Sequence, residues 1–173
     1  MRAAPGEVLH FSEDPNITRF VPHVAATARQ PEAYVWAVDA ARSPDYWFPR
    51  QCPRAMAWVT PSSTVDDRSW LMGTRVHAVE YRALEAMRTV RLFAYRFCAS
   101  DFEPFEDNAH VATRTVHPLG PPSPVGDLFE LHEQAGIELR VLPTLWPFWD
   151  VVTASTLGFS GIRLRNASPR LIP

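Results

Sequence analysis

Several short stretches carry residue types and spacings that suit chemistry on a small molecule. In the N-terminal stretch VLHFSED, His10 and Ser12 are two residues apart, so a strand places both on one face. An imidazole beside a hydroxyl can hydrogen-bond a ribose diol. The alternative for His10 is a core histidine bonded to a backbone carbonyl. In the following apolar stretch AYVWAV, Tyr34 and Trp36 offer flat faces to an aromatic cationic ring.

A cationic turn is predicted in the stretch FPRQCPR, where Arg50 and Arg54 stand among prolines. Guanidinium groups held rigidly in this way suit bidentate contacts with phosphate or carboxylate oxygens. The alternative is two surface charges on a loop. Cys52, between them, is either a thiolate whose pKa the arginines lower or a small packed thiol.

Two later stretches supply further candidate residues. The loop SDFEPFED contains Glu106 and Asp107, and a carboxylate there can orient a nucleophile or stabilise an oxocarbenium-like centre. In the C-terminal stretch GFSGIRLRNA, Ser160, Arg163 and Asn166 are predicted to complete a ligand site. The alternative for this stretch is a solvated edge strand protected from aggregation by its charges.

Composition narrows the class of protein. With 46% hydrophobic and 21% charged residues, the 173-residue chain is expected to form one globular domain, residues 1–173. All 17 basic residues are arginine, which excludes lysine Schiff bases, pyridoxal linkages and P-loops. The net charge of −2 argues against a nucleic-acid-binding protein. Without a signal-peptide pattern or an apolar run of about 20 residues, we expect a cytoplasmic protein with no membrane partner.

Familiar catalytic and metal-binding motifs are absent. The sequence lacks GxGxxG, GxxxxGK[ST], HExxH and an EF-hand loop, and GFSG around Ser160 does not have the GxSxG spacing of a nucleophile elbow. The six histidines share no metal-ligand spacing, so no metal is expected. Cys52 and Cys98 form no CxxC pair and are expected to be free thiols.

The elements that position these residues are mostly strands. β-branched and aromatic content without helical periodicity predicts strands at the stretches that follow: 8–11, 33–38, 55–60, 75–81, 91–97, 110–119 and 137–142, with a last one in 158–167. Proline-rich residues 118–124 predict an extended connection. The pattern indicates an α+β fold built on a mostly antiparallel, split sheet, with a strand-rich part at 8–119 and a C-terminal extension at 125–173.

Short helices are predicted from capping residues. Ser43 is expected to cap a one-turn helix that begins at Pro44, Thr64 to cap a second that ends at Gly73, and Asp127 to cap a third that ends at Gly136. A fourth is expected from about Pro147, with Gly158 as its end, and residues 82–88 predict a turn or a helical turn.

The order of these motifs resembles the ADP-ribosyltransferase-like fold, in particular the histidine-type, rifampin-modifying transferases, over about residues 8–119. The resemblance implies that His10 contacts the ribose of NAD, that Tyr34 or Trp36 stacks on nicotinamide, and that Glu106 or Asp107 supplies the catalytic carboxylate. The sequence differs from that family in two motifs: HFSED stands in place of the family's histidine motif, and Val38-Asp39 stand where the family usually has a threonine. The whole chain, including STLGFSGIRLRNA, also resembles a bacterial family of unknown function.

These observations leave more than one function open. The resemblance implies ADP-ribosyl or other glycosyl transfer to an unknown acceptor, with NAD as cosubstrate. The alternatives are a non-catalytic small-molecule-binding or regulatory domain of the same fold, or an enzyme of unrelated chemistry. In each of the first two cases the expected partner is a small-molecule ligand. The oligomeric state and the role of the C-terminal stretch stay open.

Overall fold

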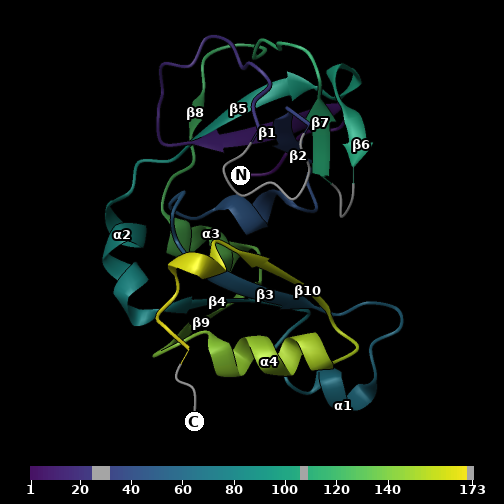
Figure 1. Ribbon diagram of the computed structural model, residues 1–173, viewed down its shortest axis with the longest axis vertical. Coiled ribbons are helices and arrows are strands. Elements are labelled where there is room, and N and C mark those ends of the chain that lie inside the picture. Colours follow the sequence, from purple (N-terminus) through teal and green to yellow (C-terminus); the bar gives the residue numbers. More distant parts are fainter. Residues whose placement is uncertain (25–31, 106–108, 171–173) are drawn as a thin grey trace. The chain divides into compact units, whose positions relative to one another are not determined.

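The chain is built of two compact units, each made of two separate stretches of sequence. The structure, a computed structural model, describes residues 1–24, 32–105 and 109–170 (Figure 1). Unit 1 comprises Met1–Trp47 and Arg91–Gly126, and unit 2 comprises Phe48–Val90 and Asp127–Pro173. Both combine a sheet with short helices, so the predicted α+β class with mostly antiparallel strands is confirmed. The single domain expected from the length stays a prediction.

Unit 1 contains a six-stranded antiparallel sheet in the order β6-β7-β2-β1-β5-β8. Its strands are β1 (Glu7–Ser12), β2 (Val35–Val38), β5 (Phe93–Cys98), β6 (Glu103–Phe105), β7 (Ala109–Ala112) and β8 (Ser123–Pro124). The described part of the unit also contains the 3-10 helices η1 (Ser43–Tyr46) and η3 (Ala99–Asp101). One face of the sheet carries its hydrophobic core, in which Phe20 packs between Tyr95 and Phe97.

Unit 2 contains a four-stranded sheet in the order β10-β3-β4-β9, in which β4 and β9 run parallel. Its strands are β3 (Arg54–Trp58), β4 (Arg75–Glu80), β9 (Glu138–Leu142) and β10 (Gly158–Ile162). Its helices are α1 (Val65–Arg68), η2 (Tyr81–Ala83), α2 (Leu84–Thr89), α3 (Leu128–Gln134), α4 (Trp146–Ala154) and η5 (Leu164–Asn166).

Different helices pack on the two faces of the unit 2 sheet. Helix α4 packs Phe148 and Val152 against Ala55, Ala57 and their neighbours, which form the hydrophobic core on one face. Figure 1 shows α4 running along that face. On the opposite face, His132 of α3 contacts His77 of β4. That opposite face therefore carries polar groups, and the register places Arg54 and Ser160 on it.

Two of the three predicted capping residues, Thr64 and Asp127, act as expected. Ser43 does not: it is the first residue of η1, and its Oγ donates to Asp39 O at 2.6 Å instead of capping the helix. Thr64 Oγ1 accepts a hydrogen bond from Asp67 N at 3.2 Å, and Asp127 Oδ1 accepts from Phe129 N and Glu130 N at 2.8 and 3.0 Å. Gly136 follows α3 with φ +64°, a conformation that glycine adopts without steric cost.

Four predicted boundaries are wrong. Helix α1 ends at Arg68 and does not continue to Gly73. Strand β7 ends at Ala112, well before the predicted end at residue 119. Gly158 begins β10 instead of ending the preceding helix, since α4 stops at Ala154. The backbone leaves the β conformation at Arg163, so Arg163 and Arg165 do not alternate with Ile162 along one strand. A one-turn 3-10 helix, η5, occupies the end of the predicted strand.

None of the helices in the described part of the chain has the length and apolar character needed to span a bilayer.

Candidate functional site

The predicted site residues are distributed over both units. Unit 1 holds His10, Ser12, Tyr34 and Trp36, whereas unit 2 holds Arg50, Arg54, Ser160, Arg163 and Asn166. The two proposed catalytic carboxylates, Glu106 and Asp107, lie outside the described residues. Each group is therefore considered within its own unit.

His10 occupies a structural position in β1. Its Nδ1 lies 2.7 Å from the backbone oxygen of Trp36, and its ring centroid is 4.8 Å from that of Phe20. A carbonyl only accepts, so Nδ1 carries a proton and donates it. This geometry matches the alternative of a core histidine bonded to a backbone carbonyl. Ser12 is also structural, because it is 3% exposed and its Oγ accepts from Asp14 N at 3.1 Å.

The resemblance implies that His10 and Tyr34 or Trp36 contact the same NAD molecule, but in the sheet Trp36 and His10 lie on opposite faces. Leu9 pairs with Val38, so Trp36 lies on the same face as Leu9, and His10 lies on the opposite face with Tyr95. Tyr34 packs with Trp36, their ring centroids 5.8 Å apart, and the Phe105 ring lies 5.2 Å from that of Trp36. The prediction used the alternation within each strand correctly, but it had no information on the register between strands.

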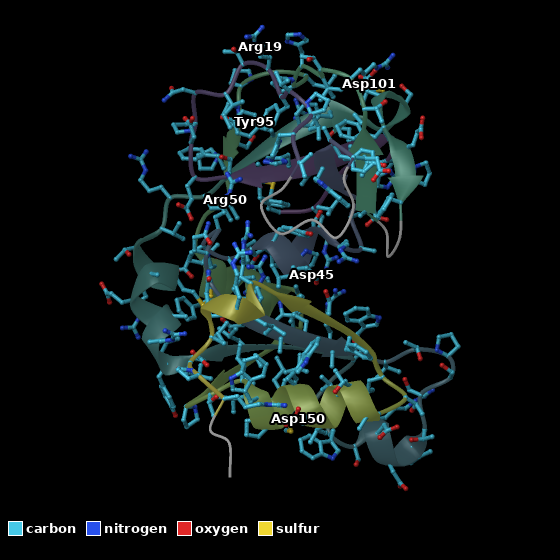
Figure 2. The ribbon with its side chains drawn as sticks, in the orientation of Figure 1. Arg19, Asp45, Arg50, Tyr95, Asp101 and Asp150 are labelled. Atoms are coloured by element: carbon cyan, nitrogen blue, oxygen red, sulfur yellow. The ribbon has the colours of Figure 1, made fainter. Side chains whose placement is uncertain are left out.

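In unit 2, two predicted groups that are more than 100 residues apart in sequence come together. Asn166 Nδ2 donates to the backbone oxygen of Gln51 at 2.9 Å, and Arg163 Nε donates to that of Arg50 at 3.4 Å. Cys52 N donates to Pro49 O at 2.9 Å, which closes Pro49–Cys52 as a turn. Figure 2 labels Arg50 close to the yellow end of the chain that follows β10. We call Arg50 and Arg163 the arginine pair.

Arg163 has an uncommon backbone conformation. Its φ of 57° and ψ of 27° are left-handed, and it is the only non-glycine residue with a positive φ among those the structure describes. An L-residue other than glycine pays about 1–2 kcal/mol for this region. The conformation directs the chain from β10 into η5, so that Asn166 reaches the turn at Arg50 and Gln51.

Arg54 is not the exposed turn residue that was predicted. It is the first residue of β3 and is 3% exposed. Its Nη1 donates to the backbone oxygen of Cys52 at 3.1 Å, and its guanidinium carbon lies 4.9 Å from the centroid of the Phe48 ring. The strand begins one residue earlier than its apolar pattern indicates, which turns the Arg54 side chain into the unit. Of the two arginines in this stretch, Arg50 is therefore the exposed one.

The thiolate alternative for Cys52 is wrong. Its side chain is buried, and this burial raises the pKa of the thiol to about 11, because the lowering effect of the nearby Arg54 is smaller than the desolvation penalty. Cys52 is the small packed thiol of the second interpretation. Arginines that are neighbours along the chain carry no information on whether the thiol is accessible to solvent.

Ser160 lies on the sheet face opposite α4, where its β10 position pairs with Met56. Trp58, Arg75 and His77 belong to the same face. The indole of Trp58 lies directly over Gly158, where an added Cβ would come within 2.3 Å of Trp58 Nε1, and the guanidinium of Arg75 lies 5.0 Å from the indole centroid. A cation–π contact thus borders the position of Ser160.

Two buried histidines on this face were missed by the sequence analysis. Arg75 Nε donates to His77 Nε2 at 3.1 Å, and an arginine is always a donor. His77 Nδ1 therefore carries the proton and donates to His132 Nε2 at 3.0 Å, whereas His132 Nδ1 donates to Leu128 O at 2.6 Å. Both imidazoles are neutral in this chain of hydrogen bonds. Burial, and secondarily the neighbouring His77, lower the pKa of His132 to about 4.

His77 and His132 are separated by 55 positions, which is no recognisable spacing, and for this reason the sequence did not reveal the pair. In the described ranges, no group of three or more histidine, cysteine or acidic residues is placed to hold a metal ion. The polar groups of this face that suit a ligand are the guanidinium, hydroxyl and amide donors. These groups recognise anions.

The comparisons with known proteins place the chain in a family. The family model described as a family of unknown function (DUF6886) matches residues 9–167. The chain belongs to this family. The match confirms the second resemblance seen in the sequence, over most of the chain. It includes the Arg50 turn, β10 and η5, so the elements that carry the arginine pair are part of the family's shared region.

No curated protein and no solved structure matches the chain. The resemblance to the ADP-ribosyltransferase-like fold accordingly stays a prediction, as do the NAD cosubstrate and the transfer reaction that it implies.

Proposed function

We propose that the protein binds a small molecule bearing a phosphate or carboxylate group, held by the arginine pair of unit 2. The observation that carries the proposal is the left-handed backbone of Arg163, whose side chain contacts the Arg50 turn. This function corresponds to the non-catalytic, ligand-binding alternative considered from the sequence.

The conformation of Arg163 supports a functional role because it costs stability. Glycine adopts the same backbone geometry without that cost, and residues that keep such strain are concentrated at ligand-binding positions. The folded chain keeps an arginine where glycine would be easier to accommodate. Contact of the Arg163 guanidinium with a ligand would explain why position 163 holds arginine and not glycine.

The surroundings of the pair favour an anion as the ligand. Two guanidinium-bearing residues are held together by a bond from one side chain to the backbone of the other, at 3.4 Å. Each guanidinium offers several N–H donors in a planar fork that matches the oxygens of a phosphate or carboxylate. The side-chain amide of Asn166 is already bonded to Gln51: its Nδ2 donates to the backbone oxygen at 2.9 Å and to the side-chain oxygen at 3.2 Å. It therefore acts as a positioning residue that holds the two loops together.

Ser160 contributes a hydroxyl three residues before Arg163, on the face that carries Trp58 and Arg75. Hydroxyl groups donate to phosphate oxygens and to sugar hydroxyls. Within the class of anionic ligands, we propose a phosphorylated, sugar-bearing molecule, and ADP-ribose is the probe that combines these groups. Such a ligand also agrees with the nucleotide expected from the sequence.

The test is a calorimetric titration of ADP-ribose at low ionic strength into the wild type and three variants. Arg50→Ala and Arg163→Gly each remove one guanidinium, and glycine at 163 keeps the left-handed turn without strain. Arg88→Ala removes an exposed guanidinium from α2 of the same unit as a control. A hydrogen bond to a charged group is worth about 1.5–3 kcal/mol, so each of the first two variants is expected to weaken binding about ten- to hundredfold.

Equal affinity in all four proteins, or no binding to the wild type, would overturn the proposal. NAD is titrated in parallel with a measurement of nicotinamide release. Binding of NAD without release supports a binding function, whereas release that is lost in Arg163→Gly assigns the transfer chemistry to the same surface.

A further inference from the structure

Strand β9 forms an open edge of the unit 2 sheet. The strand order is β10-β3-β4-β9, so β9 has β4 as its one neighbour in the described sheet. Among the described residues, no backbone hydrogen bond joins Glu138–Leu142 to a segment other than β4. Backbone groups point alternately to the two sides of a strand, so β9 presents a row of N–H and C=O groups on its outer side. Such a row is a template for pairing with another strand.

The β9 edge lacks the features that usually keep edge strands apart. Proteins protect such edges with proline, with a β-bulge or with charges that repel. Strand β9 reads Glu-Leu-Arg-Val-Leu and contains no proline. It pairs with β4 residue by residue, from Glu138 beside Val76 to Leu142 beside Glu80, without a bulge. Its one negative and one positive side chain cancel, so two copies of this edge do not repel each other.

The two charges of β9 lie on the sheet face that α4 covers. Glu138 pairs with Val76 and Arg140 pairs with Ala78, and both partners belong to the core on that face. Arg140 Nη2 lies 2.7 Å from Glu138 Oε1, so this ion pair is already closed within the strand. Pairing with another strand therefore buries no unpaired charge. Leu139, between the two, points to the opposite face.

The charges are self-complementary when two copies of β9 pair antiparallel with Leu139 at the centre. Leu139 then lies opposite Leu139 of the second copy, and Glu138 of each chain lies opposite Arg140 of the other. Opposite charges that face each other across strands stabilise a sheet, whereas like charges destabilise it. Centring the pairing on Arg140 instead places two arginines opposite each other. We propose that β9 pairs in the first register with β9 of a second copy, which joins two unit 2 sheets into one.

Exposed apolar side chains beside the edge favour the same partner. Met72 N donates to Glu138 Oε2 at 3.1 Å, and Arg140 Nη2 donates to Trp70 O at 2.9 Å. These bonds hold the segment that precedes β4 against the edge strand. Trp70 is 49% exposed and Met72 is 89% exposed. Aromatic residues and methionine are enriched at protein interfaces, and a second copy on the edge supplies apolar cover for both side chains.

Sedimentation velocity of the full chain, from micromolar to millimolar concentration, tests the association. The wild type should pass from monomer to dimer as its concentration rises. Glu138→Arg leaves arginine facing arginine across the pairing, and Arg140→Glu leaves glutamate facing glutamate. Each variant alone should therefore dimerise at least about tenfold more weakly. An equimolar mixture of the two variants brings opposite charges together again, as does the double variant Glu138→Arg/Arg140→Glu, and both samples should regain the dimer.

Three results of this experiment overturn the proposal. The first is a wild type that stays monomeric throughout the range. The second is a dimer that neither single charge reversal weakens. The third is a weakened dimer that neither the mixture nor the double variant restores, although thermal melting shows that the variants are folded.

A disulfide test fixes the register and decides the matter if a charge variant does not fold. In the background Cys98→Ser, Leu139→Cys places two thiols opposite each other, where Cα atoms are about 4.5–5.5 Å apart and within reach of a disulfide. Val141→Cys, on the same face, is the matched control, because its Cα atoms lie more than about 13 Å apart in this register. Oxidation should give a covalent dimer of Leu139→Cys and leave Val141→Cys monomeric. Equal yields in both variants, or no covalent dimer of Leu139→Cys, contradict the pairing. None of these changes alters the arginine pair, so the outcome is independent of the proposed function.

Discussion

At the scale of single residues, burial decides the chemistry that the sequence left open. Cys52 and His132 are both neutral because desolvation disfavours their charged forms. The sequence showed which groups are titratable, but it did not show which of them are inside. His10 illustrates the same point, since its Nδ1 donates to the backbone oxygen of Trp36 and its ring packs on Phe20.

The buried His132 makes stability depend on pH. Its folded pKa of about 4 lies below the ordinary value of 6.5, so the unfolded chain binds more protons between these pH values. The free energy of unfolding is therefore complete above about pH 6.5 and falls by about 3 kcal/mol as the pH drops to 4. Urea unfolding at half-unit pH steps measures this change.

The matched variants for this measurement are His132→Gln and Phe48→Leu. His132→Gln removes the titrating group, and the fall attributed to it should disappear. Phe48→Leu disturbs the packing on the same imidazole, from which the Phe48 ring centroid is 5.1 Å away, and should lower stability equally at every pH. An unchanged pH dependence in His132→Gln would show that another group is responsible.

Cys52 is expected to be unreactive in the folded protein. With a thiol pKa of about 11, about one molecule in a thousand carries the thiolate at pH 8, and the side chain is 5% exposed. In the variant Cys98→Ser, which leaves Cys52 as the remaining thiol, Ellman's reagent should report no rapid reaction in buffer and one thiol per chain in urea. Rapid reaction of folded Cys98→Ser contradicts the buried, neutral thiol.

At the scale of elements, one carboxylate connects three segments of unit 2. Glu80, at the end of β4, is 1% exposed and accepts from Leu145 N at 3.3 Å and from Ser168 N at 3.0 Å. Arg82 Nε lies 2.6 Å from Glu80 Oε2, and its Nη2 donates to Asn166 O. Burial on its own raises the pKa of Glu80, but these hydrogen bonds outweigh it and hold the pKa below the usual range.

Glu80→Gln is expected to loosen the C-terminal segment after η5. The amide keeps the shape but loses the charge, so the free energy of unfolding at pH 7 should drop by about 1–3 kcal/mol. Because the folded pKa is lowered, the contribution of the wild-type carboxylate is present above its unfolded pKa and is lost as pH falls through the folded value. The difference between wild type and variant should therefore shrink in acid.

The control for Glu80→Gln is Glu85→Gln, an exposed carboxylate on α2. A surface change of this kind usually alters stability by less than about 0.5 kcal/mol. If the two variants had equal stability, Glu80 would not be the connection between β4 and the C-terminal segment.

Local sequence signals predicted element types better than element ends. Thr64, Asp127 and Gly136 act within a few residues of their own position, so their roles could be predicted. The end of β10 could not, because it depends on the left-handed turn at Arg163 and on bonds to Gln51, 115 residues earlier in the chain. Strand β7 is shorter than its alternating pattern predicts for a similar reason. Alternation predicts a strand, but the length of that strand depends on how far its partners β2 and β6 extend.

At the scale of the whole molecule, the chain passes from unit 1 to unit 2 and back before it ends in unit 2. This interleaving brings segments from both halves of the sequence into each sheet, for example β10 beside β3. The register of β1 against β2 places Trp36 and His10 on opposite faces of their sheet. In unit 2, the bond from Arg163 Nε to Arg50 O joins the segment after β10 to the Arg50 turn. The α+β class followed from the inventory of elements, whereas the candidate site required pairings that no local pattern contains.

The arginine pair as an anion site is tested most directly by the side-chain Nε–Hε signals of arginine in two-dimensional ¹H–¹⁵N NMR spectra. Arg50→Lys and Arg163→Gly assign the two signals by their loss, and Arg88 serves as the reference arginine on α2. Titration with ADP-ribose should shift the Arg50 and Arg163 signals with one common saturation curve and leave the Arg88 signal in place. Shifts of all three signals in parallel, or of neither member of the pair while ADP-ribose binds elsewhere, would contradict the account.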